Sequence, residues 1–226
     1  MAVSRASLPE QVFRQLVGAV LDGRYQPGDR LPPQRALAAE LGVNMASLRE
    51  GIKRLEQLRL VDVRHGDAMR VKDWRAHSGL DVLAYAVTVD PAMTGALFEA
   101  RRLLLREAAR LAAGRRSQEQ AQALEDLAAA FADAPDDTTA QMIDLAFMGT
   151  VIDAAGNLVF QLILNSIREL YLGHLERFRP IVGDRDDLIP LYRRAARAIA
   201  TQEPGRAAGA VEKLAALQEQ RMVAAP

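Results

Sequence analysis

The chain has 226 residues, half of them hydrophobic, and its 29 Lys and Arg are balanced by 29 Asp and Glu. This length is enough for two modest domains, and the lack of cysteine excludes disulfides, thiolate nucleophiles and cysteine-ligated zinc. The N-terminal segment has no apolar stretch of the kind found in signal peptides, and no segment is long and apolar enough to span a bilayer. We therefore expect a cytoplasmic protein with no membrane partner.

The charges are divided unevenly along the chain. Residues 1–77 carry 13 Lys and Arg against 9 Asp and Glu, whereas residues 78–226 carry 16 against 20. A basic first part favours contact with a polyanion, although an excess this small is weak evidence by itself.

Two helices are predicted first. Apolar residues repeat at helical spacing in "PEQVFRQLVGAVL", and the pattern ends at Asp22-Gly23. A proline–glycine turn follows, and a second helix is expected at about 34–41, with Gly42 as its C-terminal stop.

A third helix follows closely. Asn44 or Ser47 can cap its start, and Leu48, Ile52 and Leu55 fall on one inward face. Because only a short turn at Gly42 separates the second and third helices, the pair predicts a helix-turn-helix.

The stretch "LVDVRHGDAMRV", residues 60–71, alternates apolar and polar residues on both sides of His65-Gly66. This pattern predicts a small hairpin, which makes the whole a winged helix. The tip histidine has three possible roles: a catalytic base, a metal ligand, or a probe inserted into a partner. Catalysis needs a base held in a pocket, and a metal needs more ligands than the neighbouring Asp67. We therefore interpret the tip as a probe for the minor groove of DNA.

The third helix also predicts a surface for DNA. Ser47, Arg49, Lys53 and Arg54 lie near its start or along its outer face, where a recognition helix meets the major groove. On charge alone, a solvated helix face is the more probable interpretation. The order helix, helix, helix, hairpin within 75 residues favours DNA instead.

Residues 8–73 resemble the DNA-binding domain of the GntR family of bacterial repressors and activators. The motifs that carry the resemblance are "GRYQPGDRLPPQRALAAELGV", "SLREGIKRLEQLRLV" and "VRHGDAMRV". The resemblance implies DNA contacts by Arg35, Arg49 and the wing tip, while Met45 stands where the family commonly has Arg, which leaves the operator sequence open. The expected DNA-binding set comprises Arg35, Asn44, Met45, Ser47, Arg49, Lys53, Arg54, His65 and Gly66.

The rest of the chain predicts an all-α bundle of six or seven helices, because no strand pattern occurs there. The segments "ARRLLLREAARLAA" and "DLAFMGTVIDAAGNLVFQLIL" resemble the effector-binding domain of the FadR subfamily, and "AAGNLVFQLILNSIRELY" resembles its fatty-acid-responsive members. The expected fold is thus mostly α with a β-hairpin wing: a winged helix-turn-helix at 1–74, a linker at 75–85, and a helical effector-binding and dimerisation domain at 86–226.

Many members of this subfamily bind a divalent metal through one Asp and three His, beginning with Asp-x-x-x-His. Here Asp144 is present, whereas Met148, Tyr192 and Leu214 take the three histidine positions in our alignment. These side chains are poor ligands for zinc, manganese or nickel, and the lone His174 is more typical of a surface or hydrogen-bonded residue. We expect no metal and no other cofactor.

Apolar residues in place of a metal cluster predict an apolar cavity for an effector. A packed core without any cavity is the alternative. The resemblance implies a long-chain fatty acid or acyl-CoA, although Glu219 stands where acyl-CoA-responsive relatives have a glycine and would repel the phosphates of CoA. The expected effector-binding set comprises Arg101, Asp144, Phe147, Met148, Val151, Phe160, Tyr192 and Leu214.

The sequence therefore predicts a homodimeric transcriptional regulator that binds a palindromic operator under the control of a small hydrophobic acid. A regulator with another carboxylate effector, or with a helical domain that only dimerises, is the alternative. An enzyme is not expected, because no nucleophile elbow, phosphate loop or paired His and carboxylate occurs.

Overall fold

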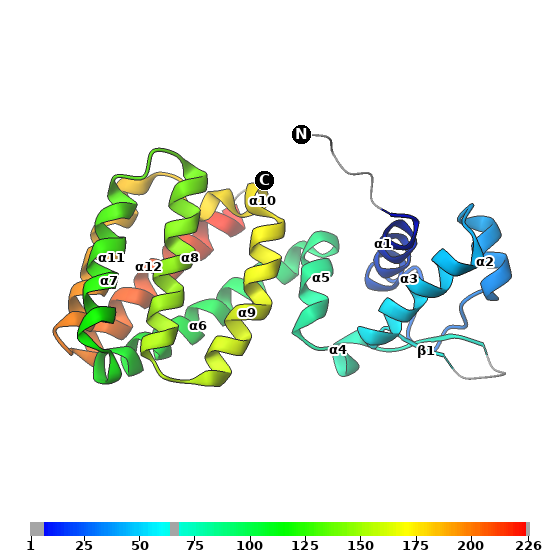
Figure 1. Ribbon diagram of the computed structural model, residues 1–226, viewed down its shortest axis with the longest axis horizontal. Helices are drawn as coiled ribbons and strands as arrows, with labels where there is room; N and C mark the ends of the chain where they lie inside the picture. The colour runs from blue at the N-terminus through cyan, green and yellow to red at the C-terminus, as the bar shows by residue number, and fades with distance from the viewer. Residues whose placement is uncertain (1–6, 64–67, 225–226) are drawn as a thin grey trace. The chain divides into compact units, whose positions relative to one another are not determined.

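The computed structural model describes residues 7–63 and 68–224, and within them it is mostly helical with one two-stranded sheet (Figure 1). This confirms the predicted fold class. The chain divides into two compact units, Met1–Asp90 and Pro91–Pro226. In the described part of the chain, no helix is long and apolar enough to cross a membrane.

The first unit is a winged helix. Its elements are α1 (Leu8–Leu21), α2 (Gln34–Glu40), α3 (Met45–Gln57), β1 (Val61–Asp62), β2 (Arg70–Val71), α4 (Trp74–His77), the 3-10 turn η1 (Leu80–Val82) and α5 (Leu83–Val89).

The packing of α1 on α3 forms the centre of this unit. The Ser7 side chain caps α1, and the apolar stripe of that helix meets the buried Leu48, Ile52 and Leu55 of α3. The two helices approach closely at Gly51, where an added Cβ would lie only 2.6 Å from Cγ1 of Val12. A side chain at this position would therefore push the two helices apart.

The base of the wing is a strand pair held by the segment before α2. β1 and β2 run antiparallel, with Val61 opposite Val71. On the other side of β2, Leu31 donates its N–H to the carbonyl of Met69 at 2.9 Å, and Val71 donates to Asp29 at 3.0 Å. The turn segment thus fixes the wing relative to the helices.

The segment expected as a linker, 75–85, contains most of α4, all of η1 and the start of α5. α5 packs on α1, where the rings of Tyr85 and Phe13 lie edge to face with their centroids 5.0 Å apart. In the structure, the part of the chain up to residue 90 belongs to the first compact unit.

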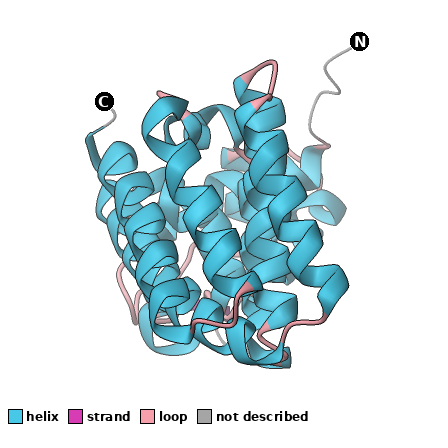
Figure 2. Cartoon of the chain, turned by 90° about the vertical axis from the view of Figure 1, so that its left-hand side faces the viewer, coloured by secondary structure: helices cyan, strands magenta, loops and turns pink. Residues whose placement is uncertain are grey.

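The second unit is a helical bundle whose long helices lie side by side (Figure 2). Its elements are α6 (Pro91–Arg115), α7 (Gln118–Ala132), α8 (Asp137–Ala154), α9 (Leu158–Gly173), α10 (Leu175–Phe178), the 3-10 turn η2 (Arg179–Val182), α11 (Arg185–Ala200) and α12 (Pro204–Ala224).

Side-chain caps start several of these helices. Ser117 and Gln120 form a reciprocal capping box at α7, while Asp136 and Asn157 cap α8 and α9. The core lies between α6, α12, α11, α7 and α8, and α9 packs mainly on α8. One side of α9 is consequently left outside the core.

Candidate functional site

The start of α3 is built as a recognition helix would be. Asn44 is the cap, since its side-chain oxygen accepts the N–H of Ser47 at 2.8 Å. Met45 is the first residue of the helix and is half-buried. This cap fixes the direction in which the helix presents its first turn.

Arg35 on α2 and Arg49 and Lys53 on α3 are exposed cations. Within residues 7–63 and 68–224, none of the three has an ion-pair partner. Unpaired guanidinium and ammonium groups beside a helix start can bind phosphates and guanine edges of DNA. The predicted wing-tip contacts, His65 and Gly66, lie outside the described residues.

Arg54 has a different environment from the other predicted DNA-binding cations. Its guanidinium forms an ion pair with Glu10 of α1 and lies 4.0 Å over the ring of Phe13. The hydrogen bond to Arg54, and then that to Arg14, lowers the pKa of the Glu10 carboxyl. Arg54 therefore joins α3 to α1, a contact that the sequence did not reveal because Glu10 lies 44 residues earlier.

The second unit contains a narrow cavity of about 50 Å³ between α6, α8 and α9. Aromatic rings form part of its wall: Phe178 lies 5.4 Å from Tyr171 and 6.1 Å from Phe98, measured between ring centroids. The lining residues are Leu97, Phe98, Arg101, Leu104, Leu105, Asp144, Leu145, Met148, Ile152, Leu164, Ile167, Leu170, Tyr171, Phe178 and Ile181.

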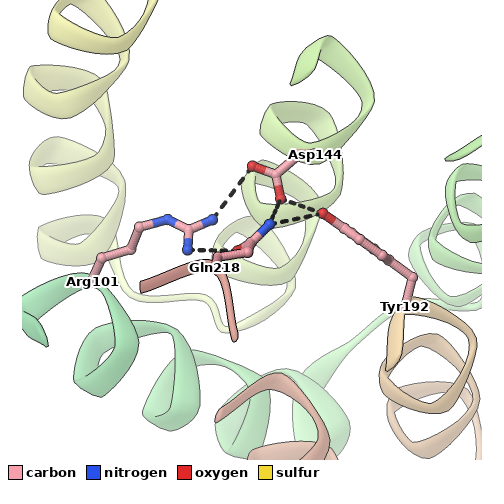
Figure 3. A network of polar contacts seen from close by, with 4 residues as sticks. All are labelled: Arg101, Asp144, Tyr192 and Gln218. Atoms are coloured by element: carbon pink, nitrogen blue, oxygen red, sulfur yellow. Dashed lines mark hydrogen bonds and ion pairs between the residues drawn. The ribbon is translucent and has the colours of Figure 1, made fainter. Parts of the chain in front are cut away.

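A polar cluster lies at the cavity, formed by Arg101, Asp144, Tyr192 and Gln218 and here called the Asp144 cluster (Figure 3). The Arg101 guanidinium donates to the side-chain amide oxygen of Gln218 at 2.8 Å and lies 3.4 Å from the Asp144 carboxylate. The Tyr192 hydroxyl and the Gln218 amide donate to the other carboxylate oxygen at 2.5 and 2.9 Å.

The cluster compensates the burial of its charges. Asp144 is 3% exposed and Gln218 is fully buried, so each donor replaces a hydrogen bond to water. Burial, together with the negative charge of Asp144, raises the pKa of the Tyr192 hydroxyl well above its ordinary value. Tyr192 therefore acts as a donor and not as an anion.

Tyr171 is the second notable hydroxyl at the cavity. The residue is 8% exposed, and its Oη has no hydrogen-bond partner among the described residues. Burial raises its pKa and the nearby Asp144 charge adds to the shift, whereas the neighbouring Gln141 side chain, whose amide donates to the carbonyl of Leu175, opposes it. A buried hydroxyl without a partner costs free energy unless a ligand or a water accepts its proton in a hydrogen bond.

The structure brings together only part of the predicted effector set. Arg101, Asp144 and Met148 line the cavity. Tyr192 lies outside the lining and donates a hydrogen bond to the Asp144 carboxylate. The remaining residues lie outside the lining: Phe147 packs against Tyr192, Val151 and Leu214 are buried in the core, and Phe160 is half-buried on α9.

The α12 residue that meets Asp144 is Gln218, one helical turn after the predicted Leu214. Residues at spacing i, i+4 lie on one face of a helix. The sequence therefore indicated the face of α12 that is turned to Asp144, but not the helical turn that makes the contact. Tyr171 was also missed, because a tyrosine in an apolar helix carries no signal that its hydroxyl lacks a partner.

The donor set does not fit a divalent metal. In residues 7–63 and 68–224, no three His, Cys, Asp or Glu side chains come together to form such a site. The Asp144 carboxylate faces the Arg101 guanidinium, which supplies a positive charge beside it. His174 lies at the end of α9, where its Nδ1 is 3.0 Å from the carbonyl of Leu170.

Comparison with known proteins identifies the family. A model of the FCD domain matches residues 96–216, and the model described as "Bacterial regulatory proteins, gntR family" matches residues 8–71. The HTH-type transcriptional regulator Mce2R of Mycobacterium tuberculosis is 35% identical over 98% of this chain and 94% of that protein. The chain belongs to the GntR family.

Other relatives of this GntR regulator are similar over less of the chain or at lower identity. The fatty acid metabolism regulator protein of Edwardsiella ictaluri is 29% identical over 69% of this chain and 66% of that protein. A solved structure of a GntR protein from Streptococcus agalactiae superposes with a TM-score of 0.51 at 24% identity, covering 94% of this chain and 99% of that one. The GntR protein described here is thus a DNA-binding transcriptional regulator with an FCD domain.

Proposed function

We propose that this GntR regulator acts in the cytoplasm as a homodimer on a palindromic operator and that a small hydrophobic carboxylate controls its binding. α3 and the wing of each subunit would contact one half-site, because half-site spacing mirrors the two-fold symmetry of such dimers. The chain would have no catalytic role.

The observation that carries the effector proposal is the pairing of polar anchors with apolar walls. Arg101 brings a guanidinium that already pairs with Asp144 and Gln218, and Tyr171 brings an unpartnered hydroxyl, to a cavity otherwise lined mainly by leucine, isoleucine and aromatic side chains. A carboxylate accepts hydrogen bonds from both kinds of donor, and an alkyl chain fits the remaining walls.

The size of the cavity adds a condition. At about 50 Å³ it is several times smaller than the roughly 300 Å³ at which ligand pockets begin. A long acyl chain would therefore enter only if a wall moved. α9 is the wall best able to move, since it packs mainly on α8.

A free fatty acid suits the site better than an acyl-CoA. Glu219 and Glu212 of α12 lie on either side of Arg102, with Glu219 at 2.8 Å and Glu212 at 3.6 Å. Glu212 also pairs with Arg106 at 3.2 Å, so the two carboxylates neutralise both guanidiniums and leave neither to bind the phosphates of CoA.

Fluorescence anisotropy on labelled DNA from upstream of the chain's own gene tests the proposal. At fixed salt we expect tight binding by the wild type, none by Arg49→Ala, and release of the wild type by oleate. Release by oleoyl-CoA and not by oleate would reverse our preference for the free acid.

The alternatives give different results. If no fatty acid, acyl-CoA or small dicarboxylate shifts the melting temperature or the anisotropy, the helical domain serves dimerisation alone. Release by a short dicarboxylate would identify another carboxylate effector. Unchanged DNA binding by Arg49→Ala would overturn the assignment of α3 as the recognition helix.

A further inference from the structure

α9 has apolar residues on two opposite faces. Its inner face supplies Leu164, Ile167, Leu170 and Tyr171 to the cavity wall. Its outer face exposes large apolar side chains: Leu158 at 67%, Val159 at 61%, Leu162 at 57% and Leu172 at 44%. A surface helix of a monomer normally turns a polar face to water, so an outer face of this kind indicates a contact that the single chain leaves unmade.

The exposed residues follow the spacing of a helix-pairing seam. Leu158, Leu162, Asn165, Glu169 and Leu172, here called the α9 stripe, succeed one another at intervals of four, three, four and three residues, and all are exposed. This is the interval at which one helix places side chains along a second helix packed against it. The α9 stripe therefore fits a helix as its partner.

We propose that a second copy of this chain covers the α9 stripe, with the two α9 helices packed antiparallel about a two-fold axis between Asn165 and Ser166. This inference rests on the proposed homodimer and names its surface. The axis places Leu158 and Val159 against Leu172 of the partner subunit, and Leu162 against Glu169 of the partner subunit. The apolar ends of the stripe then cover each other.

The polar residues of the stripe favour the antiparallel arrangement. In a parallel pair each Glu169 would face its own copy, and two like charges would repel. In the antiparallel pair the Glu169 carboxylates lie on opposite sides of the axis. The Asn165 side chain, which has no hydrogen bond in the part of the chain that the structure describes, lies at the axis and can pair with its symmetry mate.

Charge also favours a second copy over a membrane surface. The formal net charge of the chain is zero, so two copies do not repel each other as wholes. Helices that lie on membranes carry several Lys and Arg beside their apolar face, whereas α9 contains only Arg168.

Sedimentation equilibrium of the full chain tests the proposal. We expect a wild-type dimer whose dissociation constant rises at least about tenfold in Leu162→Glu, because this carboxylate would face Glu169 of the partner subunit in an apolar interface. Val223→Glu, at an equally exposed apolar position on α12, is the matched control and should leave the dimer intact. Adding Glu169→Lys to Leu162→Glu should restore the dimer.

A second measurement does not depend on a disruptive variant. Because the chain has no cysteine, Asn165→Cys introduces a single thiol, which the axis would bring close to its symmetry mate. Oxidation should link this variant into a covalent dimer, whereas Leu103→Cys on α6 should stay unlinked.

The outcomes separate the two proposals. A monomeric wild type would overturn the homodimer and the stripe together. A dimer that survives Leu162→Glu with native circular dichroism, or an Asn165→Cys chain that does not cross-link, would overturn the stripe and leave the homodimer standing. Equal loss of the dimer in Leu162→Glu and Val223→Glu would likewise overturn the stripe.

Discussion

At the scale of single residues, two arginines of one helix differ in their surroundings, and we propose that Arg49 contacts DNA whereas Arg54 serves packing. Arg49 is exposed and without an ion-pair partner in the described part of the chain, whereas Arg54 bonds Glu10 and covers Phe13. The sequence pattern places both outside the apolar stripe of α3, and only the position of α1 distinguishes their surroundings.

We expect this division to appear in paired variants. Arg49→Ala should abolish operator binding and leave the free energy of unfolding within about 0.5 kcal/mol of the wild type, as is usual for surface substitutions. Arg54→Ala should lower the free energy of unfolding by about 1 kcal/mol or more, through its lost ion pair and packing. Chemical denaturation followed by circular dichroism, beside anisotropy, measures both; equal stabilities would contradict the role given to Arg54.

The Glu10–Arg54 pair also predicts a dependence on pH. Because Arg54 lowers the pKa of Glu10 in the folded state, the unfolded chain takes up this proton at a higher pH. The contribution of the pair is therefore present above the ordinary carboxyl pKa and is lost as the pH falls through the lowered one. Between about pH 5 and pH 3, the free energy of unfolding should fall more for the wild type than for Glu10→Gln, by about 0.5 kcal/mol for a partly exposed pair. Urea titrations at each pH measure this free energy, and an equal fall for the wild type and Glu10→Gln would contradict the prediction.

Tyr171→Phe isolates the unpartnered hydroxyl at the cavity. Removing a buried hydroxyl that has no partner should leave the ligand-free protein equally stable or more stable, since nothing bonded is lost. The same change should weaken oleate binding by about 3- to 10-fold if the hydroxyl donates to the carboxylate. Thermal unfolding with and without oleate measures both effects. Tyr25→Phe in the first unit is the control, and a ligand-free chain destabilised by Tyr171→Phe would show that the hydroxyl has a structural partner.

At the scale of elements, Gly51 determines how closely α1 and α3 pack. An alanine at this position would bring its Cβ within 2.6 Å of Val12, so either the side chain or the helix must shift. Gly18 of α1 has open space around it and serves as the matched glycine. We expect Gly51→Ala to lower the free energy of unfolding by about 1–3 kcal/mol, and Gly18→Ala to raise it by up to about 1 kcal/mol through helix propensity. Urea denaturation gives both values, and similar effects of the two changes would contradict the close approach.

The winged helix could be predicted from sequence because each of its elements has a local signal. The proline–glycine turn, Gly42 and the Asn44 cap mark the helix ends, and period-two alternation marks the strands around the wing. The observed α2, Gln34–Glu40, and the start of α3 at Met45 lie within one or two residues of expectation. These boundaries depend on residues close in sequence.

The proposed effector cavity could be predicted only in part because it depends on register between distant helices. Leu214 and Gln218 share a face of α12, and no local pattern tells which of them reaches Asp144. Phe160 was expected at the cavity because apolar residues are usually inside. On α9 that rule fails, since its outer face is apolar as well.

At the scale of the whole molecule, control of DNA binding by an effector is a coupling free energy and must be reciprocal. If oleate bound at both sites of the homodimer lowers operator affinity by some factor, saturating operator DNA must lower the overall two-site oleate affinity by the same factor. Titrating oleate into the free protein and into the operator complex measures the second factor, and anisotropy gives the first. Unequal factors would mean that another equilibrium, such as dissociation of the homodimer, contributes to release.

The position of α9, with a cavity on one side and exposed leucines on the other, has a consequence on the timescale of backbone opening. A helix with little packed against it opens locally at a small cost in free energy, so its amide hydrogens exchange with solvent deuterium before those of the core. In dilute protein we expect residues 158–173 to exchange faster than α8 or α12. Subunit association would cover one side of this helix and effector binding the other, and each should slow the exchange separately. Hydrogen exchange of a peptide from residues 158–173 would therefore report both events.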